Sequence, residues 1–489
     1  MFRQVEAFRQ VEAVPHVEAV RQFKAVRQFK AVATAFLVLL LAPSTELANR
    51  GTEASVEDSQ VSTQASLPSV KRDFLLNELQ LLVLPQAGTG SVTVHLRVNS
   101  GAMFDLAGKG GLADFTAGML LRSAKGVPNK DLSDFLNQSG LTLNLRVGWD
   151  STNITISGPA ALLESILDLL ERLVVNPSFE QPELDALKAA RIKELAAEKP
   201  GHMELARQAA LEALYGRYPL GRPVHGSVDS ISKINRNDVV YFHNRFYIAN
   251  DAELAVTGDV TPEEVTKLAR AKLGIWKKGE KVPATFLPPD PLGSRKIVLV
   301  DRPDSPNSTL VLASPGISRR ASDYLATAVM VRLLESIAAR SASGAKAMLE
   351  ARYLPGPILV SFDSPPDKAA TALQAILDTM ERLKSGDIPQ EDLEAAKQSL
   401  IASYAQDSAT AGGQIASIFD IEQYGLGRDY MVNFQARVAA ITSNDVNSAA
   451  KKHLNPAAVA IAAVGPASAL SDPLKKLGQV SVVGSRQTF

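Results

Sequence analysis

Alternation of apolar and polar residues marks several β-strands in the first half of the chain. Residues 92–98 alternate strictly, which is typical of a strand with one buried face, and 79–84 form a short apolar run. Apolar positions three or four residues apart predict amphipathic helices between the strands. The predicted strands are 79–84, 92–98, 141–147, 153–157 and 252–257. The predicted helices are 112–121, 159–174, 182–197, 203–215, 237–246 and 262–273.

The second half repeats the same order of elements. The predicted strands are 296–300, 308–313, 357–362 and 458–464, and the predicted helices are 322–339, 367–383 and 390–404. The residues repeat too, because 166–173 returns as 376–383 with six of eight positions identical. Further matched pairs are 184–188 with 393–397, 237–239 with 444–446, and Gly258 with Gly465. A period of about 210 residues is too long for a solenoid repeat and indicates a duplicated globular domain.

The sequence therefore predicts an α+β protein built of two homologous sheet-plus-helix domains. The domains are expected at 71–276 and 296–485, joined by a proline-rich, charged linker at 277–295. A duplicated domain makes a two-lobed molecule, and we expect its function in the cleft between the lobes.

The first 70 residues have the composition of a leader and a tether. Residues 2–7 and 8–13 are identical, and 31–42 form an apolar segment of 12 residues preceded by basic residues. This length fits the apolar core of a signal peptide and is too short for a transmembrane helix. We expect 1–48 to be a low-complexity leader plus signal peptide and 49–70 to be a flexible tether. The protein is therefore expected to be exported, to the periplasm or the extracellular space, with no stable membrane span.

Composition and short motifs exclude several classes of function. The chain carries 52 basic and 52 acidic residues, so it lacks the electrostatic footprint of a nucleic-acid-binding protein. It has no cysteine, which excludes disulfides, thiolate zinc sites and cysteine nucleophiles. The glycine-rich stretch 108–111 lacks the residues of a phosphate loop, and 343–346 matches Ser-x-x-Lys without its companion motifs. The charged run 188–199 is interpreted as a solvated helix face.

Four short phrases at characteristic spacing point to a known family. They are Gly-Leu-Ala at 111–113, Asn-Pro-Ser-Phe at 176–179, Tyr-Pro-Leu-Gly-Arg-Pro at 218–223 with Gly226, and Val-Thr-Gly-Asp at 256–259. In this order, and with the duplication, the chain resembles the M16 metallopeptidase family (insulinase, pitrilysin and mitochondrial processing peptidase relatives). The resemblance covers about residues 72–485. It implies two-domain subunits that commonly assemble as dimers, whose four domains enclose a chamber.

Active members of this family are expected to carry His-x-x-Glu-His on the helix that follows Gly-Leu-Ala. Two histidines four residues apart share one helix face and bind zinc, while the glutamate activates the metal-bound water. In this chain residues 114–118 read Asp-Phe-Thr-Ala-Gly, so both histidines and the general base are missing. The family's downstream glutamate ligand corresponds to Glu194. One carboxylate each from Asp114 and Glu194 makes a poor zinc site, and we predict no catalytic residue, no metal site and no cofactor.

The remaining candidate residues do not restore the site. The six histidines show no paired metal spacing; they are His16, His95, His202, His225, His243 and His453. The family also uses an arginine and a tyrosine of the second domain to hold the substrate backbone. Here Arg352 and Tyr353 are adjacent and directly precede Leu-Pro-Gly, which differs from the spaced pair of the family. At the level of sequence, any remaining role of Glu194, Arg352 or Tyr353 stays open.

These observations predict a catalytically silent M16-type protein, the non-catalytic subunit of an active zinc peptidase in peptide or protein processing. The partner would be an active M16 subunit in a heterodimer, with a peptide substrate in the interdomain cleft. One alternative is a stand-alone peptide-binding scaffold that forms a homodimer. Another is a residual metallopeptidase in which Asp114 and Glu194 hold manganese or calcium. Chelator-sensitive hydrolysis that disappears in Asp114→Ala would favour this last alternative.

Overall fold

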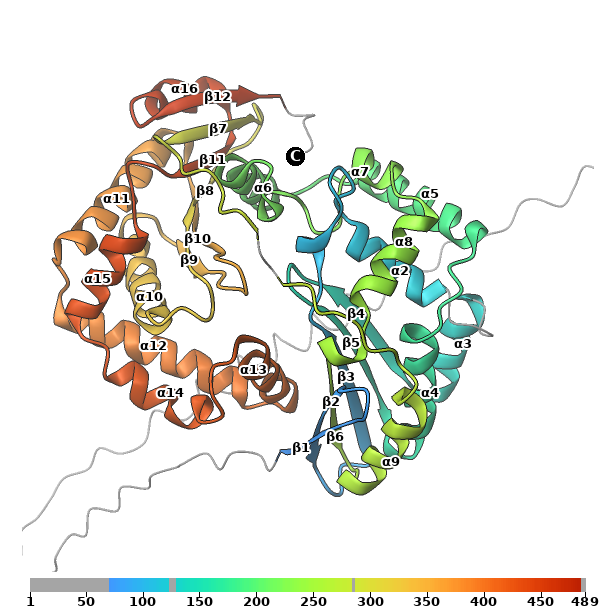
Figure 1. The fold of residues 1–489 in the computed structure, drawn as a ribbon. Coiled ribbons are helices and arrows are strands. Elements are labelled where there is room, and N and C mark those ends of the chain that lie inside the picture. The colour runs from blue at the N-terminus through green and yellow to red at the C-terminus, as the bar shows by residue number, and fades with distance from the viewer. Residues whose placement is uncertain (1–69, 123–128, 284–285, 485–489) are drawn as a thin grey trace, which may run out of the picture. The chain divides into compact units, whose positions relative to one another are not determined.

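A computed structural model of the chain describes residues 70–122, 129–283 and 286–484 (Figure 1). The leader predicted at 1–48 and the tether predicted at 49–70 lie outside the described residues, apart from Val70. Within the described part of the chain, no helix is long and apolar enough to cross a membrane.

The first half forms a six-stranded sheet, here called sheet A, in the order β1-β2-β6-β3-β5-β4. Its strands are β1 (Lys71–Phe74), β2 (Gln80–Pro85), β3 (Ser91–Val98), β4 (Thr142–Val147), β5 (Thr152–Pro159) and β6 (Ala252–Gly258). Its helices are α2 (Leu112–Arg122), α3 (Asn129–Ser139), α4 (Leu163–Val174), α5 (Gln181–Ala197), α6 (His202–Tyr215), α7 (Val228–Ser232), α8 (Arg236–Phe246) and α9 (Pro262–Leu273). Short 3-10 turns are η1 (Ala102–Phe104), η2 (Ala160–Leu162), η3 (Pro219–Gly221) and η4 (Ala249–Asp251).

The second half forms another six-stranded sheet, here called sheet B, in the order β12-β7-β11-β8-β10-β9. Its strands are β7 (Lys296–Asp301), β8 (Ser308–Pro315), β9 (Lys346–Leu349), β10 (Pro357–Ser364), β11 (Ala460–Gly465) and β12 (Gln479–Val483). Its helices are α10 (Tyr324–Ser341), α11 (Pro366–Ser385), α12 (Gln390–Ser408), α13 (Ala411–Tyr424), α14 (Tyr430–Ala439), α15 (Ser443–His453) and α16 (Ala467–Lys475).

The two sheets share one topology, as the sequence repeat predicts. β2 runs parallel to β6 and β7 parallel to β11, while β3 and β8 each lie antiparallel between two neighbours. The repeat markers fall on equivalent elements: α4 and α11, α5 and α12, α8 and α15, and the ends of β6 and β11. Only the strand beside the parallel pair differs, because β1 is antiparallel to β2 whereas β12 is parallel to β7. The prediction of two homologous sheet-plus-helix domains is therefore confirmed.

One face of each sheet packs against helices of its own half. In β3 the predicted alternation is visible directly, because Val94 and Leu96 are 1% exposed whereas Thr93, His95 and Arg97 are only half-buried. Helices α2, α4 and α9 contact the apolar face of sheet A. In the second half, α10 and α11 contact sheet B in the same way. Each half therefore has an apolar core between its sheet and its own helices.

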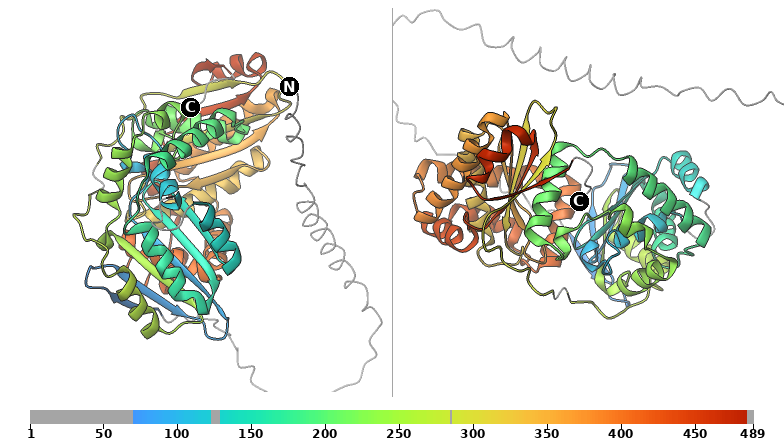
Figure 2. Two further views of the ribbon diagram at one scale, coloured as in Figure 1. Left: turned by 90° about the vertical axis from the view of Figure 1, so that its right-hand side faces the viewer. Right: turned by 90° about the horizontal axis from the view of Figure 1, so that it is seen from above.

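The other face of sheet B is covered by a helix of the first half. Helix α6 packs on β7, β8 and β11, and Ala206 and Ala210 on this helix are 0% exposed. The strand residues in the same cluster are small or β-branched, such as Val311, Ala460 and Ala462. Small side chains on both surfaces let the helix lie close to the sheet. The two views of Figure 2 show the same arrangement from other sides.

Helix α13 of the second half is the counterpart of α6 and packs on sheet A. Both helices have 14 residues. Ile415, Ile418 and Phe419 of α13 form a buried cluster with Leu82 and Ala255 of β2 and β6. Each half thus contributes one helix, α6 or α13, that covers the second face of the other half's sheet. We call this arrangement the helix exchange.

Some elements differ from the sequence prediction. The helix predicted over 159–174 begins only at Leu163, because β5 stays paired with β3 as far as Pro159 and a 3-10 turn follows. Residues 277–295, predicted as a linker, contain no helix or strand among their described residues. Sequence reasoning missed several elements: α3, α7, α13, α14, α15, α16, β1, β9 and β12.

The helix exchange predicts that one charge beneath α6 destabilises the protein. Ala206→Asp would bury a carboxylate between α6 and sheet B without a partner, at a cost of at least about 3 kcal/mol. Urea denaturation followed by circular dichroism should show a lower midpoint. Glu212→Gln, at an exposed position of the same helix, should change the stability by less than about 0.5 kcal/mol. A wild-type midpoint for Ala206→Asp would contradict this packing.

Candidate functional site

A buried carboxylate holds the start of α2, the helix that carries positions 114–118. Asp105 accepts hydrogen bonds from the backbone N–H groups of Gly111 and Ala113, both at 2.7 Å. N–H groups at the start of a helix have no partner within it, so Asp105 acts as a cap. Gly111 has φ +88°, and a Cβ there would lie 2.7 Å from the carbonyl oxygen of His225. Glycine is therefore required where the chain enters α2.

Asp114, the first of the five motif positions, forms an ion pair with an arginine. Arg191 Nη2 donates to Asp114 Oδ2 at 3.0 Å, and Arg191 Nη1 donates to Glu194 Oε2 at 3.2 Å. Arg191 and Glu194 lie one turn apart on α5, which packs beside α2. The guanidinium thus bridges the two carboxylates that the sequence analysis considered together, and it compensates their charge.

The last motif position has no room for a larger side chain. A Cβ on Gly118 would lie 3.2 Å from Leu187 Cδ2 of α5. Leu187 is itself 7% exposed, so it has little freedom to move. A side chain at position 118 would therefore require Leu187 to shift by a few tenths of an ångström. Phe115, Thr116 and Ala117 between these ends are buried in the core.

These residues do not fit zinc. A catalytic zinc site needs three protein ligands, mostly imidazoles, whereas Asp114 offers one carboxylate that is already paired. In the described part of the chain, no group of three or more His, Cys, Asp or Glu residues is arranged to hold a metal ion. Burial raises the pKa of Asp114 above its ordinary value. The charges of Arg191 and His225 lower this pKa, and the charge of Glu194 raises it. The arrangement is that of a structural ion pair.

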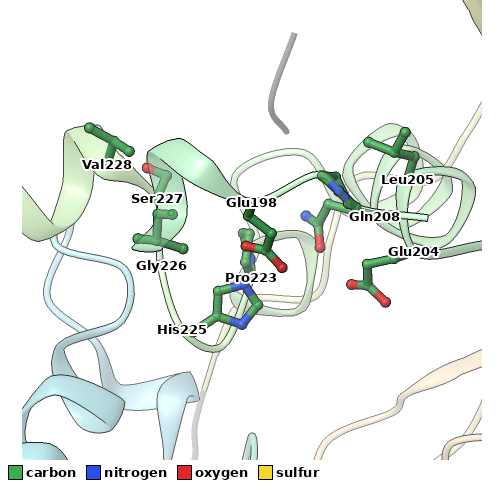
Figure 3. A pocket seen from close by; sticks show the side chains of 11 residues that line it. Glu198, Glu204, Leu205, Gln208, Pro223, His225, Gly226, Ser227 and Val228 are labelled. Atoms are coloured by element: carbon green, nitrogen blue, oxygen red, sulfur yellow. The ribbon is translucent and has the colours of Figure 1, made fainter. Parts of the chain in front are cut away.

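A pocket of about 620 Å³ lies between the end of α5 and the start of α6 (Figure 3). Its apolar lining includes Leu195, Leu205 and Val228, and its polar lining includes Glu198, Glu204, Gln208 and His225. Neither glutamate has an ion-pair partner among the described residues. Leu195 of its lining directly follows Glu194 on α5, so the pocket adjoins the end of α5 that carries the ion pair. The result is a partly apolar pocket with free carboxylates.

The histidines serve separate purposes. His243 contacts the carbonyl oxygen of Val174 at 3.0 Å, and its burial lowers its pKa. His95 contacts the Thr155 hydroxyl at 3.1 Å, and burial lowers its pKa to about 4. The others stand on different elements: His202 begins α6, His225 lines the pocket, His453 pairs with Asp323, and His16 lies outside the described residues.

Arg352 and Tyr353 make contacts within the fold. Arg352 Nη2 donates to Glu350 Oε2 at 3.2 Å, and Glu350 Oε1 accepts from Arg207 of α6 at 2.7 Å. The backbone N–H of Tyr353 donates to Asp150 Oδ2 at 3.1 Å. Both residues therefore help to tie a loop of the second half to the first half.

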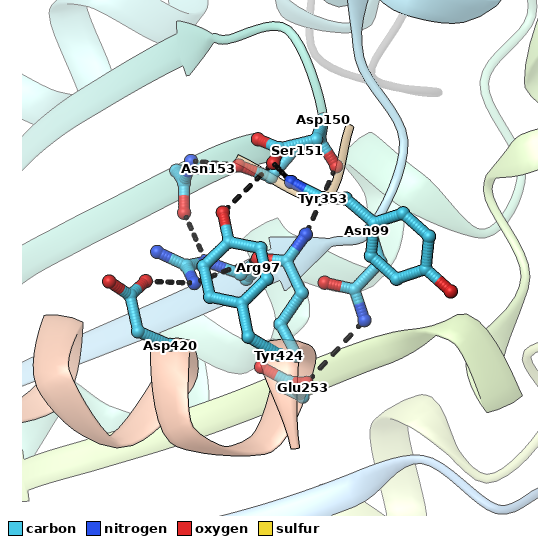
Figure 4. A network of polar contacts seen from close by, with 10 residues as sticks. Arg97, Asn99, Asp150, Ser151, Asn153, Glu253, Tyr353, Asp420 and Tyr424 are labelled. Atoms are coloured by element: carbon cyan, nitrogen blue, oxygen red, sulfur yellow. Dashed lines mark hydrogen bonds and ion pairs between the residues drawn. The ribbon is translucent and has the colours of Figure 1, made fainter. Parts of the chain in front are cut away.

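Asp150 is the centre of a polar network between the halves (Figure 4). It is 4% exposed, and its Oδ2 also accepts from the Tyr424 hydroxyl at 2.8 Å. Its carbonyl oxygen accepts from Gln423 Nε2 at 3.3 Å. A buried carboxylate needs such donors, because an unpaired one is costly. The network fixes the end of α13 beside β5.

A second group of contacts fixes α13 to sheet A. Arg97 Nη1 on β3 donates to Asp420 Oδ1 at 3.1 Å, and Arg72 Nε on β1 donates to Glu422 Oε1 at 3.1 Å. Glu253 on β6, a neighbour of Arg97 in the sheet, is 5% exposed. Burial raises the pKa of Glu253 to about 7, although Arg97 and a hydrogen bond from Asn99 lower it. The apolar contact of α13 is therefore surrounded by charged residues.

Sequence reasoning placed some of these residues and missed others. The interpretation of 188–199 as a solvated face holds for Lys193 and Glu198, which are exposed, and fails for Arg191, which faces Asp114. Arg191 and Glu194 lie one helical turn apart, so their side chains can reach the same neighbouring group. The sequence contains no signal that identifies that target, because α2 lies some 75 residues earlier.

The ion pair predicts a measurable role for Arg191. Arg191→Met keeps the aliphatic stem and removes the cation, which leaves Asp114 without its partner. We expect a loss of about 1–2 kcal/mol, modest because both side chains are partly solvated. Lys193→Met, at an exposed position of the same helix, is the control and should stay within about 0.5 kcal/mol. Equal urea midpoints for the two variants would rule out a stabilising ion pair.

Glu253 predicts a pH dependence of stability. Its pKa of about 7 in the folded protein lies above the ordinary 4.5, so between these values the unfolded chain releases a proton that the folded protein keeps. Stability should therefore fall as pH rises from about 4.5 to 7, by on the order of 3 kcal/mol. Glu253→Gln removes the contribution of Glu253 to this slope, which urea denaturation at three pH values can measure. Asp105, whose pKa burial also raises to about 7, contributes equally in both proteins. The same slope in both proteins would disprove the assignment.

Two sequence models of one family match the chain. The model described as "Insulinase (Peptidase family M16)" matches residues 81–227, and the model described as "Peptidase M16 inactive domain" matches 233–400. Together they cover more than half of the chain, in both homologous halves. The second match begins within the first half, before α8.

The chain is similar to curated proteins of the same family. An "Uncharacterized zinc protease" of Rickettsia bellii is 23% identical over 244 residues, which are 50% of this chain and 58% of that protein. The "Non-peptidase homolog YmxG" of Helicobacter pylori is 19% identical over 419 residues, which are 82% of this chain and 93% of that protein. The chain thus spans little more than half the length of the first relatives it matches, and nearly the whole length of the non-peptidase homologue.

Solved structures share the fold. A peptidase M16 inactive domain from Pseudomonas fluorescens has a TM-score of 0.73 at 21% identity, covering 81% of this chain and 98% of that one. The periplasmic protease PqqL from Escherichia coli has a TM-score of 0.67 at 16% identity, covering 86% of this chain and 50% of that one. Fold, duplication and sequence matches agree, and the chain belongs to the M16 peptidase family.

Proposed function

We propose that this protein is a non-catalytic M16 subunit that binds peptides and works beside an active zinc peptidase. The observation that carries the proposal is the guanidinium of Arg191 between Asp114 and Glu194, at the positions where the family holds zinc ligands. Without the histidines and the glutamate, the site has no means to activate a metal-bound water. Gly111 and Asp105 still build the start of α2. A retained scaffold without chemistry favours a role in binding or assembly.

The pocket beside the ion pair supports peptide binding. Leu195, Leu205 and Val228 offer an apolar wall for the aliphatic stem of a side chain. Glu198 and Glu204 offer free carboxylates for a cation at its end. This combination favours the lysine or arginine side chain of a peptide.

The partner and the compartment are parts of the same proposal. The silent site leaves hydrolysis to another chain, and an active M16 subunit in a heterodimer would supply it. Export is supported by the predicted signal peptide and by the likeness to a periplasmic protein of Escherichia coli. A homodimer that binds peptides without any peptidase is the competing assembly.

Peptide binding tests this proposal. A fluorescently labelled peptide of alanine, glycine and leucine with one central arginine should bind the wild-type protein without being hydrolysed. The double variant Glu198→Gln/Glu204→Gln should bind it about tenfold more weakly, because each exposed carboxylate contributes about 0.5–1 kcal/mol. Glu212→Gln, on the same helix as Glu204 but outside this pocket, is the control for the loss of one of these two charges.

Two results would contradict the proposal. Equal affinity of the wild-type and double-variant proteins for the arginine peptide would remove the assigned pocket. Hydrolysis that stops with a chelator and in Asp114→Ala would show a residual metallopeptidase, the alternative that the ion pair argues against.

A further inference from the structure

A second cavity of about 450 Å³ lies at one end of sheet A. Its lining residues come in part from the starts of β2 and β6 and from the end of β3. None of them also lines the pocket beside the ion pair. Glu253, Asn99 and Glu78 contribute oxygen atoms to its lining, and Phe74 and Lys281 stand there as well. Neither the duplication nor the family resemblance assigns a role to this cavity.

Two buried acceptors in this cavity have no donor. Glu253 is 5% exposed, and its Oε2 has no hydrogen-bond partner among the described residues. Asn99 Oδ1 is likewise buried and has no described partner, while Asn99 Nδ2 donates to Glu253 Oε1 at 3.4 Å. An unpaired buried acceptor costs about 1–3 kcal/mol, and native proteins rarely keep two side by side. These two acceptors therefore call for a hydrogen-bond donor.

The chain's own cations are engaged elsewhere. Arg97 neighbours Glu253 in the sheet, but its guanidinium donates to Asn153 and to the acidic end of α13. Lys281 is 61% exposed at its side chain, and its Nζ lies 4.0 Å from Asp251. The pKa of about 7 at Glu253 agrees with this, because burial raises it more than Arg97 and Asn99 lower it. Among the described residues, no cation pairs with the Glu253 carboxylate, which is ionised above about pH 7.

An apolar rim is held beside the cavity. The tip of the β1–β2 hairpin presents Leu76, which is 99% exposed, and Phe74, which is 59% exposed. Ile275 is 62% exposed and lies on the neighbouring segment 273–276. Asn77 Nδ2 donates to the carbonyl oxygens of residues 273 and 276 in this segment, at 2.8 and 3.0 Å. Glu78 in the tip has φ +63°, a conformation that costs a non-glycine residue about 1 kcal/mol. The tip is therefore a fixed apolar surface.

We propose that this surface binds a partner protein that inserts a lysine or arginine side chain into the cavity. The cation donates to Glu253 Oε2 and Asn99 Oδ1, and apolar residues flanking it in the partner cover Leu76, Phe74 and Ile275. Ammonium and guanidinium groups carry only donors, which matches the two unpaired acceptors in the cavity. Arginine is enriched in protein interfaces and at their energetic centres. The proposal does not depend on the silent site or on the peptide pocket.

Two matched peptides test the proposal: acetyl-Leu-Lys-Leu-amide and acetyl-Leu-norleucine-Leu-amide, which lacks only the ammonium group. Binding is measured by saturation-transfer NMR and isothermal calorimetry on the full-length chain. The chain carries Glu198→Gln and Glu204→Gln as its background, so that the peptide pocket does not contribute. The lysine peptide should bind at least tenfold more tightly than the norleucine peptide.

Variants of the surface locate the binding. Glu253→Gln in this background should weaken the lysine peptide at least tenfold, while Asp73→Asn, a nearby charge outside the cavity, should leave it unchanged. Leu76→Ser, at a fully exposed position that does not affect folding, should weaken it about threefold to tenfold. Equal affinity for Glu253→Gln and its background would overturn the proposal. Calcium chloride that raises the melting temperature through Glu253, with no effect of the lysine peptide, would assign the cavity to a metal ion and also overturn it.

Discussion

The exchange of α6 and α13 is the contact on which the rest of the structure depends. Each sheet covers one face with its own helices and the other with a helix of the opposite half. Burial of a side chain the size of Ile415 or Phe419 contributes on the order of 1.5–3 kcal/mol, so separating the halves would expose two apolar faces at once. The contacts of Asp150 and Arg97 surround this apolar contact and fix its geometry. The two domains therefore form one structural unit.

Within this unit the positions that correspond to the family's zinc motif are part of the scaffold. Arg191 supplies a positive charge between Asp114 and Glu194, and Leu187 fills the space at Gly118. An arginine keeps its charge at every physiological pH, so this bridge needs neither metal nor protonation. Helix α2 thus packs on α5 without the residues of the zinc motif. A pocket with free carboxylates remains beside it, which fits a binding role.

The sequence predicts the duplicated fold well because strand alternation and helical spacing are local properties. The repeat also predicts which elements correspond, for example α4 with α11. Sequence reasoning missed α13, although apolar residues at Ile415, Ile418 and Phe419 follow helical spacing, and nothing in that pattern indicates that the helix covers sheet A. The sequence also shows directly that residues 114–118 lack the zinc motif. The ion pair of Arg191 with Asp114, and the unpaired acceptors at Glu253 and Asn99, arise from contacts between distant segments.

Native mass spectrometry of the mature protein, purified from its own cells, tests the central claim most directly. The account predicts a one-to-one complex with a second chain that carries an intact His-x-x-Glu-His motif, with one zinc ion per pair bound to that second chain. A homodimer without a second chain and without metal would contradict the role as partner of an active peptidase. One zinc ion bound by this chain alone would contradict the silent site itself.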